Sequence, residues 1–325
     1  MRILGENLVL FRDDKNRPGL LGIHCSHRGT DLSYGRVEDG GLRCVYHGWL
    51  YDINGRCLEQ PGEPGGGEHR DVIRHPAYPC EEKGGAIFTY MGPGKAPLLP
   101  NYEFLGVTAD RRYVAKIYHE CNYQQANEGN IDPVHLSYLH RFFEVPQNRY
   151  TGVRNTEDSH YSLVARDVAP TIDVELTDFG VRIYTTRKQP GDNVYLRVSY
   201  FILPNLSAFP GQTGGEGYSV NWHVPIDDTH HWKYYFQYKG DEPVNPNAVR
   251  SGRTPITPDY HPVPNKANRY LQDRESMKTW SFSGMGRIFN VQDTAIVEGS
   301  GSIVDRTQEF LGPSDRAIIA ARRQL

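Results

Sequence analysis

Two short motifs, each combining one cysteine with one histidine, limit most strongly what this chain can fold into. Cys25 and His27 form the first motif, and Cys44 and His47 form the second after sixteen intervening residues. Two thiolates can hold one iron of a [2Fe–2S] cluster while two imidazoles hold the other. Neutral imidazoles in place of thiolates remove negative charge and raise the reduction potential. We therefore expect two loops that converge on one such cluster.

A structural zinc ion is the alternative, because zinc also accepts two cysteines and two histidines. Zinc fingers usually pair cysteine with cysteine and histidine with histidine along the chain, whereas each motif here is mixed. Gly48 and Trp49 follow the second motif and complete the form C-x-H-R-G…C-x-x-H-G-W, which is typical of Rieske clusters. The sequence favours the Rieske cluster. Cys57, Cys80 and Cys121 lack such partners and are expected to be ordinary small residues.

Composition restricts the location and the partners of the chain. Its 325 residues suffice for one large domain or two ordinary ones, and its net charge of -3 gives no reason to expect a nucleic-acid partner. No apolar run reaches the roughly 18 residues that a membrane span needs, and the first residues lack the features of a signal peptide. Five cysteines, an odd number spread thinly, do not make a disulfide framework, so we expect a reducing cytoplasm.

A second metal motif lies further along, in the order D-x2-H-x4-H. Asp132 and His135 are three residues apart and would share one face of a helix. His135 and His140 are five apart, roughly 140° around a regular helix, so they could not both reach one metal from it. A π-bulge or a helix break between them would bring them together. Two histidines and one carboxylate form the facial triad of non-heme Fe(II) oxygenases.

The carboxylate of such a triad has to come from elsewhere in the chain. Asp293, in the run N-V-Q-D-T-A-I-V-E, is the best candidate, and Glu298 and Asp305 are its rivals. Two histidines and a distant aspartate could also be ordinary surface or core residues, but the iron–sulfur motif upstream weakens that interpretation.

The chain divides into two regions of different texture. Residues 1–100 contain short apolar runs broken by Gly, Pro, Asp and Asn, which predicts a small antiparallel β-domain. In residues 101–325 we expect helices at Tyr118–Leu139, Asn290–Gly299 and Ser314–Leu325, the last capped by Ser314. The strands expected in this second region are Thr171–Glu175, Gly180–Thr186, Val194–Leu203, Tyr218–Val224 and Trp232–Tyr238. The Gly-rich stretches 62–67 and 211–217 do not lie between a strand and a helix, so neither predicts a dinucleotide-binding fingerprint.

Taken together, these motifs resemble the Rieske aromatic-ring oxygenase α-subunits, in particular the phthalate 4,5-dioxygenase-like branch, whose relatives include oxygenases that demethylate methoxyaromatics. The resemblance runs from the opening RILGENLVLFRD, through CSHRGTDLSYGRVEDGGLRCVYHGW and EGNIDPVHLSYLH, to the final QDTAIVEGSGSIVDRTQEFLGPSDRAIIAARR. It implies an α+β chain, with an all-β Rieske domain followed by a helix-grip catalytic domain, an antiparallel sheet around a helix. Members usually extend beyond both ends seen here, so both ends are expected to be truncated.

The resemblance also implies roles for individual residues. Four of them, Cys25, His27, Cys44 and His47, would hold the [2Fe–2S] cluster, and His135, His140 and Asp293 would hold the catalytic iron. The assembly would be a head-to-tail homotrimer or a multiple of trimers. Asp132 would link the two centres in it, by accepting hydrogen bonds from its own His135 and from His47 of the neighbouring copy. Electrons would come from NADH or NADPH through a separate flavin or iron–sulfur reductase.

The expected activity is oxidation of an aromatic, carboxylated substrate with dioxygen, either by cis-dihydroxylation or by monooxygenation such as O-demethylation. A plain Rieske electron carrier is the rival class, but about 200 residues with a second metal motif follow the cluster motifs. A zinc-stabilised binding module is a third possibility. Asn205, Phe209 and Trp222 are candidates for contact with the substrate ring, with simple core packing as the alternative for the two aromatics, and Arg197 is a candidate anchor for a carboxylate.

Overall fold

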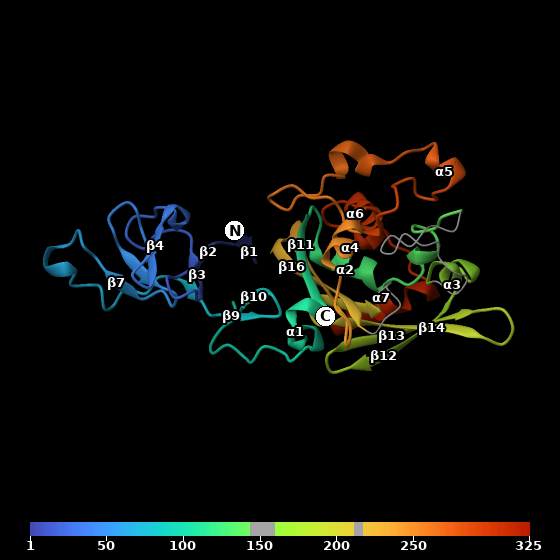
Figure 1. Ribbon diagram of the computed structural model, residues 1–325, viewed down its shortest axis with the longest axis horizontal. Helices are drawn as coiled ribbons and strands as arrows, with labels where there is room; N and C mark the ends of the chain where they lie inside the picture. The colour runs from blue at the N-terminus through green and yellow to red at the C-terminus, as the bar shows by residue number, and fades with distance from the viewer. Residues whose placement is uncertain (144–159, 211–216) are drawn as a thin grey trace. The chain divides into compact units, whose positions relative to one another are not determined.

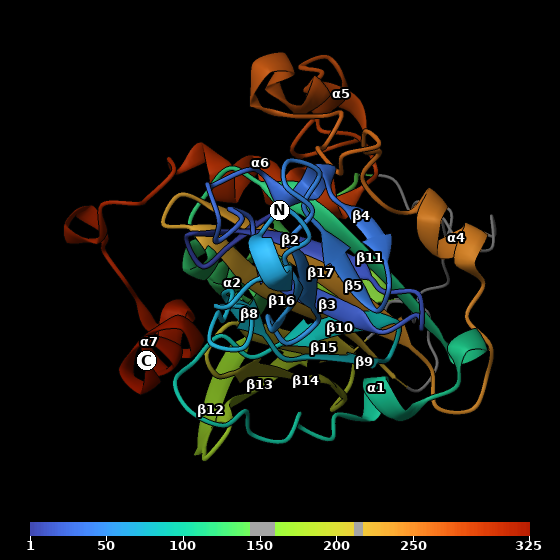
Figure 2. The ribbon, with the colours of Figure 1, turned by 90° about the vertical axis from the view of Figure 1, so that its left-hand side faces the viewer.

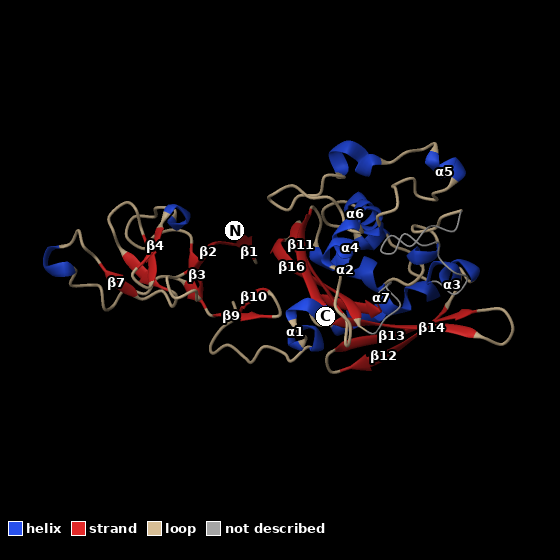
Figure 3. Cartoon of the chain, in the orientation of Figure 1, coloured by secondary structure: helices blue, strands red, loops and turns tan. Residues whose placement is uncertain are grey.

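The chain forms two compact units, Met1–Gly106 and Val107–Leu325. The computed structural model describes residues 1–143, 160–210 and 217–325, so most of the Gly-rich stretch 211–217 lies outside the described residues. Strands and loops dominate the first unit, whereas the second combines a large sheet with helices (Figure 3). Among the described residues no helix is both long and apolar enough to cross a membrane.

The first unit is built from small antiparallel sheets. One has the order β1-β2-β3-β8, a second has the order β4-β5-β6-β7, and β9 pairs with β10. A buried cluster that includes Leu21, Leu32 and Tyr51 forms its core, and Cys25 and Cys44 belong to the same cluster. The strands are β1 Arg2–Ile3, β2 Glu6–Arg12, β3 Pro18–Gly22, β4 Arg36–Glu38, β5 Gly41–Arg43, β6 Leu50–Asp52, β7 Cys57–Glu59, β8 Ala77–Tyr78, β9 Cys80–Lys83 and β10 Ala86–Thr89. The helix α1, Glu103–Gly106, closes the unit.

A seven-stranded antiparallel sheet dominates the second unit, in the order β11-β17-β16-β15-β14-β13-β12 (Figure 1). Alternation with a period of two shapes its strands: in β13 the side chains of Val181, Ile183, Thr185 and Arg187 are all buried. The strands are β11 Arg112–His119, β12 Thr171–Thr177, β13 Gly180–Lys188, β14 Val194–Ile202, β15 Leu206–Pro210, β16 Tyr218–Asp227 and β17 His230–Tyr238.

Helices pack against this sheet and position the functional residues. Helix α2, Tyr123–Ile131, packs on β16 and also contacts α6, Phe289–Gly299, and α7, Arg316–Gln324. Helix α7 lies beside β12 (Figure 2). The described residues of this unit also form three shorter helices, α3 His160–Arg166, α4 Pro246–Ser251 and α5 Ser276–Thr279. An antiparallel sheet that holds a helix against one face confirms the expected α+β architecture with a helix-grip catalytic domain.

The helix expected at Tyr118–Leu139 is much shorter in the structure. Residues up to His119 belong to β11, and α2 begins only at Tyr123. Asn122 caps the helix, because its side chain accepts a hydrogen bond from the Gln124 backbone N–H at 2.9 Å. The alternating apolar residues before Asn122 fit a strand as well as a helix, so the apolar pattern did not show where the helix begins.

The prediction of a helix at the C-terminal end is confirmed, but the prediction that Ser314 caps it is wrong. Ser314 lies in a short 3-10 turn, Pro313–Asp315, and Asp315 takes the N-cap position of α7. The Asp315 side chain instead accepts a hydrogen bond from the Gly312 backbone N–H at 2.8 Å. Pro313 fixes this turn ahead of the helix, which displaces the cap by one residue.

Helix α7 is tied to α2 through a buried carboxylate. Glu128 accepts hydrogen bonds from Arg322 at 2.7 and 2.8 Å, and from Arg306 at 2.9 and 3.0 Å. Arg322 also bonds Glu309, so the same guanidinium joins two acidic partners. The two contacts between the Arg322 guanidinium and the Glu128 carboxylate fix both the distance between these groups and their relative orientation.

Candidate active site and metal centres

Two tight loops in the first unit bring the four predicted cluster ligands close to one another. The loop with Cys25 follows β3, and the loop with Cys44 joins β5 to β6. Each loop folds back on its cysteine: the backbone N–H of Gly29 donates to the Cys25 carbonyl at 2.8 Å, and that of Gly48 to the Cys44 carbonyl at 3.0 Å. The backbone angle φ is +76° at Gly29 and +78° at Gly48, values that residues other than glycine rarely adopt.

The donor atoms in these loops fit a two-iron cluster. The ring centroids of His27 and His47 lie 4.5 Å apart, and Nδ1 of His27 is buried with no hydrogen-bond partner. An unpaired, buried imidazole nitrogen is costly unless something else occupies its lone pair, as a bound iron would. Cys25 and Cys44 are buried next to each other. The Tyr51 hydroxyl lies 3.2 Å from Cys25 Sγ.

The zinc alternative fits less well. One zinc ion needs its ligand atoms around a single point. Among the described residues, the one group of three or more histidine, cysteine or acidic side chains compact enough for a single ion is His135, His140 and Asp293. The two Cys/His motifs do not form such a group, whereas two irons would separate the thiolates from the imidazoles.

The second candidate site lies where α2 ends. Asp132 terminates the helix with an extended backbone, because the ring of Pro133 disfavours a helical residue before it. Arg187 of β13 is completely buried and donates to the Pro133 carbonyl at 2.7 Å, which holds the chain as it leaves the helix. His135 then opens a short 3-10 turn, His135–Ser137. A helix break, and not a π-bulge, therefore changes the direction of the chain between the two histidines.

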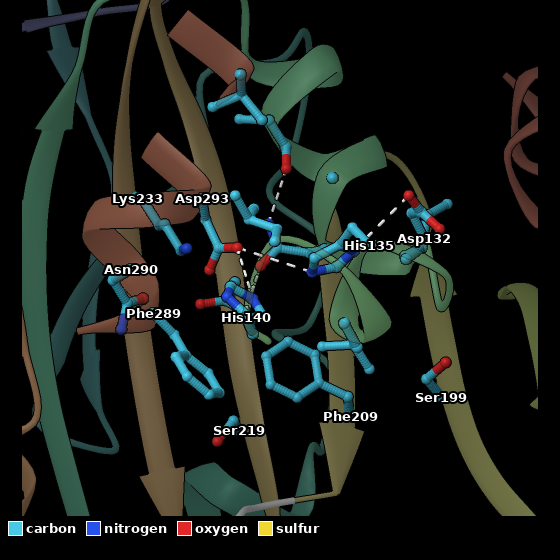
Figure 4. Close-up of a pocket in the computed structure, with 18 of the residues that line it drawn as sticks. Asp132, His135, His140, Ser199, Phe209, Ser219, Lys233, Phe289, Asn290 and Asp293 are labelled. Carbon is cyan, nitrogen blue, oxygen red and sulfur yellow. Dashed lines mark hydrogen bonds and ion pairs between the residues drawn. The ribbon is translucent and has the colours of Figure 1, made fainter. Parts of the chain in front are cut away.

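This break allows both imidazoles to reach the same carboxylate on α6. Asp293 Oδ1 lies 3.0 Å from His140 Nε2 and 3.7 Å from His135 Nε2. In Figure 4 the three side chains point toward one another, and their ligand atoms all lie within 4.8 Å of one another. Two imidazoles and one carboxylate, with the remaining directions open, are the donor set of mononuclear non-heme iron sites.

Electrostatics in this cluster hold the carboxylate in the ionised form that a metal ligand needs, and without a metal they favour a proton on His135. Burial opposes ionisation of Asp293, but His140 and His135 outweigh it and lower its pKa to about 2. Burial likewise opposes the charging of His135, yet Asp132 and Asp293 outweigh it and raise the His135 pKa. Without a metal, a proton on His135 compensates the carboxylates, and a metal cation that displaced this proton would take over that role.

Further contacts orient the two imidazoles. The His140 ring stacks on Phe289 with the centroids 4.0 Å apart, and its Nδ1 lies 2.7 Å from Gln292 Oε1. On the other side, Asp132 Oδ2 lies 3.7 Å from His135 Nδ1 and Asp132 Oδ1 accepts from the Val134 backbone N–H at 2.7 Å. These contacts leave the Nε2 atoms of both histidines directed at Asp293.

The rival carboxylates lie elsewhere. Glu298 is buried, and its oxygens accept hydrogen bonds from the Glu120 backbone N–H at 2.9 Å and the Tyr270 hydroxyl at 2.5 Å. Asp305 caps a 3-10 turn by accepting from the Thr307 backbone N–H at 3.0 Å. Neither carboxylate belongs to the compact group formed by Asp293 with the histidines.

A pocket adjoins the triad and is enclosed by α2, α6 and the inward face of the sheet. Two of the four predicted substrate contacts, Phe209 and Arg197, line it. Asn205 and Trp222 do not, and they bond each other instead, with Trp222 Nε1 donating to Asn205 Oδ1 at 3.0 Å. The cause is strand alternation: the neighbours of Trp222 in β16, Asn221 and His223, face the pocket, so Trp222 faces the other way.

The pocket also contains a buried lysine that sequence reasoning missed. Lys233 in β17 is only 5% exposed, and its ammonium group points toward the triad (Figure 4). Burial lowers its pKa to about 8, although Asp293 opposes this effect. The alternation His231, Lys233, Tyr235, Gln237 on one face of the strand could have indicated it, because a cation seldom takes an inward position without a function.

Comparison with known proteins identifies the class of protein that this fold and site define. Residues 1–78 match the Rieske [2Fe-2S] domain family, and residues 89–325 match the family described as LigXa C-terminal domain like. The chain is 36% identical over 340 residues to the phthalate 4,5-dioxygenase oxygenase subunit of Pseudomonas putida, covering 99% of this chain and 74% of the relative. It is 31% identical over 333 residues to the 5,5'-dehydrodivanillate O-demethylase oxygenase subunit of Sphingobium sp., covering 100% of this chain and 69% of that relative.

Solved structures agree with this fold. Dicamba monooxygenase bound to dicamba superposes with a TM-score of 0.65 at 16% identity, over 99% of this chain and 90% of that one. The oxygenase in the reduced oxygenase–ferredoxin complex of carbazole 1,9a-dioxygenase gives a TM-score of 0.62 at 21% identity, over 99% and 83%.

The chain is a member of the Rieske non-heme iron oxygenases. As an oxygenase component of that family, it uses a Rieske [2Fe–2S] cluster together with a mononuclear iron, and a reductase supplies the electrons.

Proposed function

We propose that this chain oxidises an aromatic substrate that carries a carboxylate or another anionic group. The pocket beside the triad supports the proposal, because it combines aromatic faces with buried cations. Phe209 and Phe289 offer rings to an aromatic substrate, and Lys233 and Arg197 offer positive charge to an anion. A buried ammonium that bonds no carboxylate among the described residues gains most from an anionic ligand.

We assign the metal ligands as the motifs suggest. Cys25, His27, Cys44 and His47 would hold the cluster. His135, His140 and Asp293 would hold the iron, which when bound supplies an open coordination site for dioxygen next to the substrate. Around that site, Lys233 would hold the substrate anion in place and Phe289 would shield one side from water.

The assembly we propose is a head-to-tail homotrimer, in which the cluster of one copy serves the iron of the next. Such a heterologous contact closes into a ring when the rotation is threefold. Asp132 would lie at the junction, because it already approaches the Nδ1 side of His135 and could accept a second hydrogen bond from His47 of the neighbouring copy.

Electrons would reach the cluster from a separate ferredoxin or flavin-containing reductase that draws on NADH or NADPH. A related oxygenase, that of carbazole 1,9a-dioxygenase, forms a complex with a ferredoxin. We place the chain in the cytoplasm, where cysteine thiols stay reduced and can bind a cluster, and where these donors are available.

O-Demethylation is a second candidate reaction. The chain is 31% identical to an oxygenase subunit of 5,5'-dehydrodivanillate O-demethylase, a value close to its identity with several dioxygenase subunits. Both reactions need the same metals and an aromatic pocket, so the substrate decides between them.

A product screen tests the proposal. The oxygenase, supplied with a surrogate reductase, NADH and ¹⁸O₂, would be offered benzoates, phthalates and their methoxy derivatives, with products read by mass spectrometry. A product with two ¹⁸O atoms indicates dihydroxylation, whereas formaldehyde release indicates O-demethylation. Failure of every aromatic acid to be oxidised or to bind, with both metals present, would refute the proposed substrate class.

Variants locate the anionic group of the substrate. Lys233→Met should weaken binding of the preferred acid by roughly tenfold or more, since it removes a charge-assisted hydrogen bond. Arg197→Ala tests the second cation, and unchanged affinity would remove Arg197 from the site. Arg250→Met, an exposed cation on α4, is the matched control and should bind like the wild type.

A further inference from the structure

A chain of hydrogen bonds runs beneath the pocket, through side chains that the iron site does not use. Asn130 Nδ2 lies 2.9 Å from His223 Nε2, His223 Nδ1 lies 3.0 Å from His231 Nε2, and His231 Nδ1 lies 2.8 Å from the backbone carbonyl oxygen of Cys121. Both histidines are completely buried. This series of hydrogen bonds therefore begins at the Cys121 carbonyl group and ends at Asn130 on α2, next to the pocket.

Both imidazoles are neutral. Burial, together with the positive charge of Lys233, lowers the pKa of His223 well below its ordinary value, and burial lowers that of His231 to about 3. His119 stacks against His231 at 4.8 Å and contributes no negative charge. The buried carboxyl group of Glu298 lies 3.7 Å from His119 Nδ1, and no hydrogen bond joins it to His223 or His231 among the described residues.

A carbonyl oxygen can only accept a hydrogen bond, and this sets the direction of every link. His231 must donate from Nδ1, so its Nε2 accepts. His223 must then donate from Nδ1 and accept at Nε2, and Asn130 must donate from Nδ2. A second carbonyl requires the same orientation of the amide, because Asn130 Nδ2 also donates to the Ala126 carbonyl at 2.8 Å. Two independent acceptors thus lock the Asn130 amide.

The locked amide determines which way Asn221 faces. With its nitrogen committed, Asn130 can offer only Oδ1, and Asn221 donates to that oxygen from Nδ2 at 2.9 Å. Asn221 lines the pocket and is 1% exposed. Its own Oδ1 accepts no hydrogen bond from the part of the chain that the structure describes. This oxygen is also not among the fully buried polar atoms without a partner, so it keeps some accessible surface.

We infer that Asn221 is a specificity-determining residue that presents a hydrogen-bond acceptor to the substrate, so that the preferred aromatic carries an O–H or N–H donor, such as a ring hydroxyl, besides its anionic group. This inference rests on the proposed function and deepens it. A hydroxyl that fits satisfies Asn221 Oδ1, whereas a hydrogen or a methoxy group leaves a buried acceptor unpaired. Sites built for a hydroxyl discriminate strongly against analogues that lack it.

The test uses the holoenzyme, anaerobic and with both metals confirmed, and measures dissociation constants for three matched series. These are benzoate, the three hydroxybenzoate isomers and the three methoxybenzoate isomers. We expect at least one hydroxybenzoate to bind roughly tenfold more tightly than both benzoate and the matching methoxybenzoate. This measurement needs no variant, so a folding defect cannot obscure it.

Variants then attribute the preference to the amide. Asn221→Leu should abolish the preference for the hydroxyl, so that the favoured hydroxybenzoate and benzoate bind with similar dissociation constants. Asn130→Leu, which frees the Asn221 amide to rotate, should reduce the preference in the same direction. Asn193→Leu is the matched control: it removes an exposed amide that donates to the Pro190 carbonyl outside the pocket, and the preference should remain. Iron content and the cluster spectrum show whether each variant is intact.

The outcomes separate this inference from the proposed function. If aromatic acids bind in a Lys233-dependent manner but hydroxy, methoxy and unsubstituted acids bind equally, the inference is wrong and the proposed function stands. A preference for methoxybenzoate that disappears in Asn221→Leu would mean that the amide presents its N–H, which also overturns the inference. If no aromatic acid binds, both fall.

Discussion

Gln292 and His140 form a hydrogen bond of 2.7 Å between Oε1 and Nδ1 that leaves the other ring nitrogen of His140 free to face Asp293. The Gln292 amide is itself held, because its Nε2 donates to the Gly286 carbonyl at 2.7 Å. The oxygen must therefore face the histidine. Adjacent residues of α6 thus supply the candidate carboxylate ligand and the group that orients a histidine ligand.

Replacing Gln292 by Leu should weaken iron binding without removing a ligand. Loss of such an orienting hydrogen bond typically costs roughly 10- to 100-fold in metal affinity. Iron retained after dialysis against a graded chelator series measures the effect, and the cluster absorbance should be unchanged. Gln308→Leu, at an exposed glutamine, is the control. Wild-type iron affinity in Gln292→Leu would show that the ring needs no such support.

Asp293→Ala should abolish the mononuclear iron and turnover and leave the cluster spectrum intact. Glu298→Ala should keep the iron, because Glu298 is bonded to Tyr270 and to the Glu120 backbone and not to the triad. It should instead lower thermal stability, since the Tyr270 hydroxyl and the Glu120 N–H lose their acceptor. Metal analysis of both proteins decides, and the reverse pattern would transfer the ligand role to Glu298.

Asp132→Asn should retain both metals and accept an electron at the cluster, yet pass it to the iron very slowly. The amide keeps the size of the side chain but loses the charge that attracts the imidazole of His135. Single-turnover stopped-flow measurement of cluster reoxidation, with substrate and dioxygen present, gives the transfer rate. Sedimentation of the same sample reports whether a trimer forms. Normal turnover, or a fully active monomer, would contradict the proposed junction.

Tyr51→Phe should lower the reduction potential of the cluster by an amount on the order of tens of millivolts. The Tyr51 hydroxyl lies 3.2 Å from Cys25 Sγ, and a hydrogen bond to a ligand sulfur stabilises the more negative, reduced state. Redox titration followed by EPR measures the shift. Tyr34→Phe, at an exposed tyrosine of the same unit, should leave the potential unchanged.

Acid should destabilise the catalytic unit through its buried histidines. The pKa of His231 in the folded chain is about 3, below the ordinary value of 6.5, so the unfolded state binds the extra proton between these values. Stability is therefore complete above about pH 6.5 and falls as the pH decreases, by roughly 1.4 kcal/mol per pH unit for each such histidine. His119 and His223 act in the same direction.

Comparing unfolding midpoints across pH 4–7 for the wild type and His231→Gln measures this effect. The glutamine does not titrate, so the variant should lose stability less steeply as the pH falls, whatever its stability at pH 7. His69→Gln, at an exposed histidine, should keep the wild-type slope. Parallel curves for His231→Gln and the wild type would show that His231 is not the acid-sensitive group.

The sequence allowed some of these features to be predicted because their signals are local. The Cys25 and Cys44 motifs and the 132–140 motif carry their chemistry within a few residues, and Pro133 already marks the helix end that brings His135 and His140 together. Metal chemistry requires those residue types at short spacing, so one chain segment is enough to identify them.

Features of the pocket were harder to predict because they depend on which way a strand faces. Trp222 and Asn221 are neighbours in β16, and a shift of one residue exchanges the side chain that enters the pocket. Lys233 and Asn130 acquire their surroundings from segments about a hundred residues away, or from the opposite layer of the fold. The residue pattern within one short segment does not indicate which distant segments will pack against it.

The ion pairs between α7 and Glu128 have a practical consequence for engineered versions of this enzyme. Glu128 lies on the helix that leads into the 132–140 segment, and one of its two cationic partners is Arg322 in the last turn of α7. A version that ends or is spliced before Arg322 would leave the buried carboxylate of Glu128 with only part of its compensating positive charge. Poor iron loading in such a protein would then report a loosened scaffold, although every metal-binding residue was still encoded.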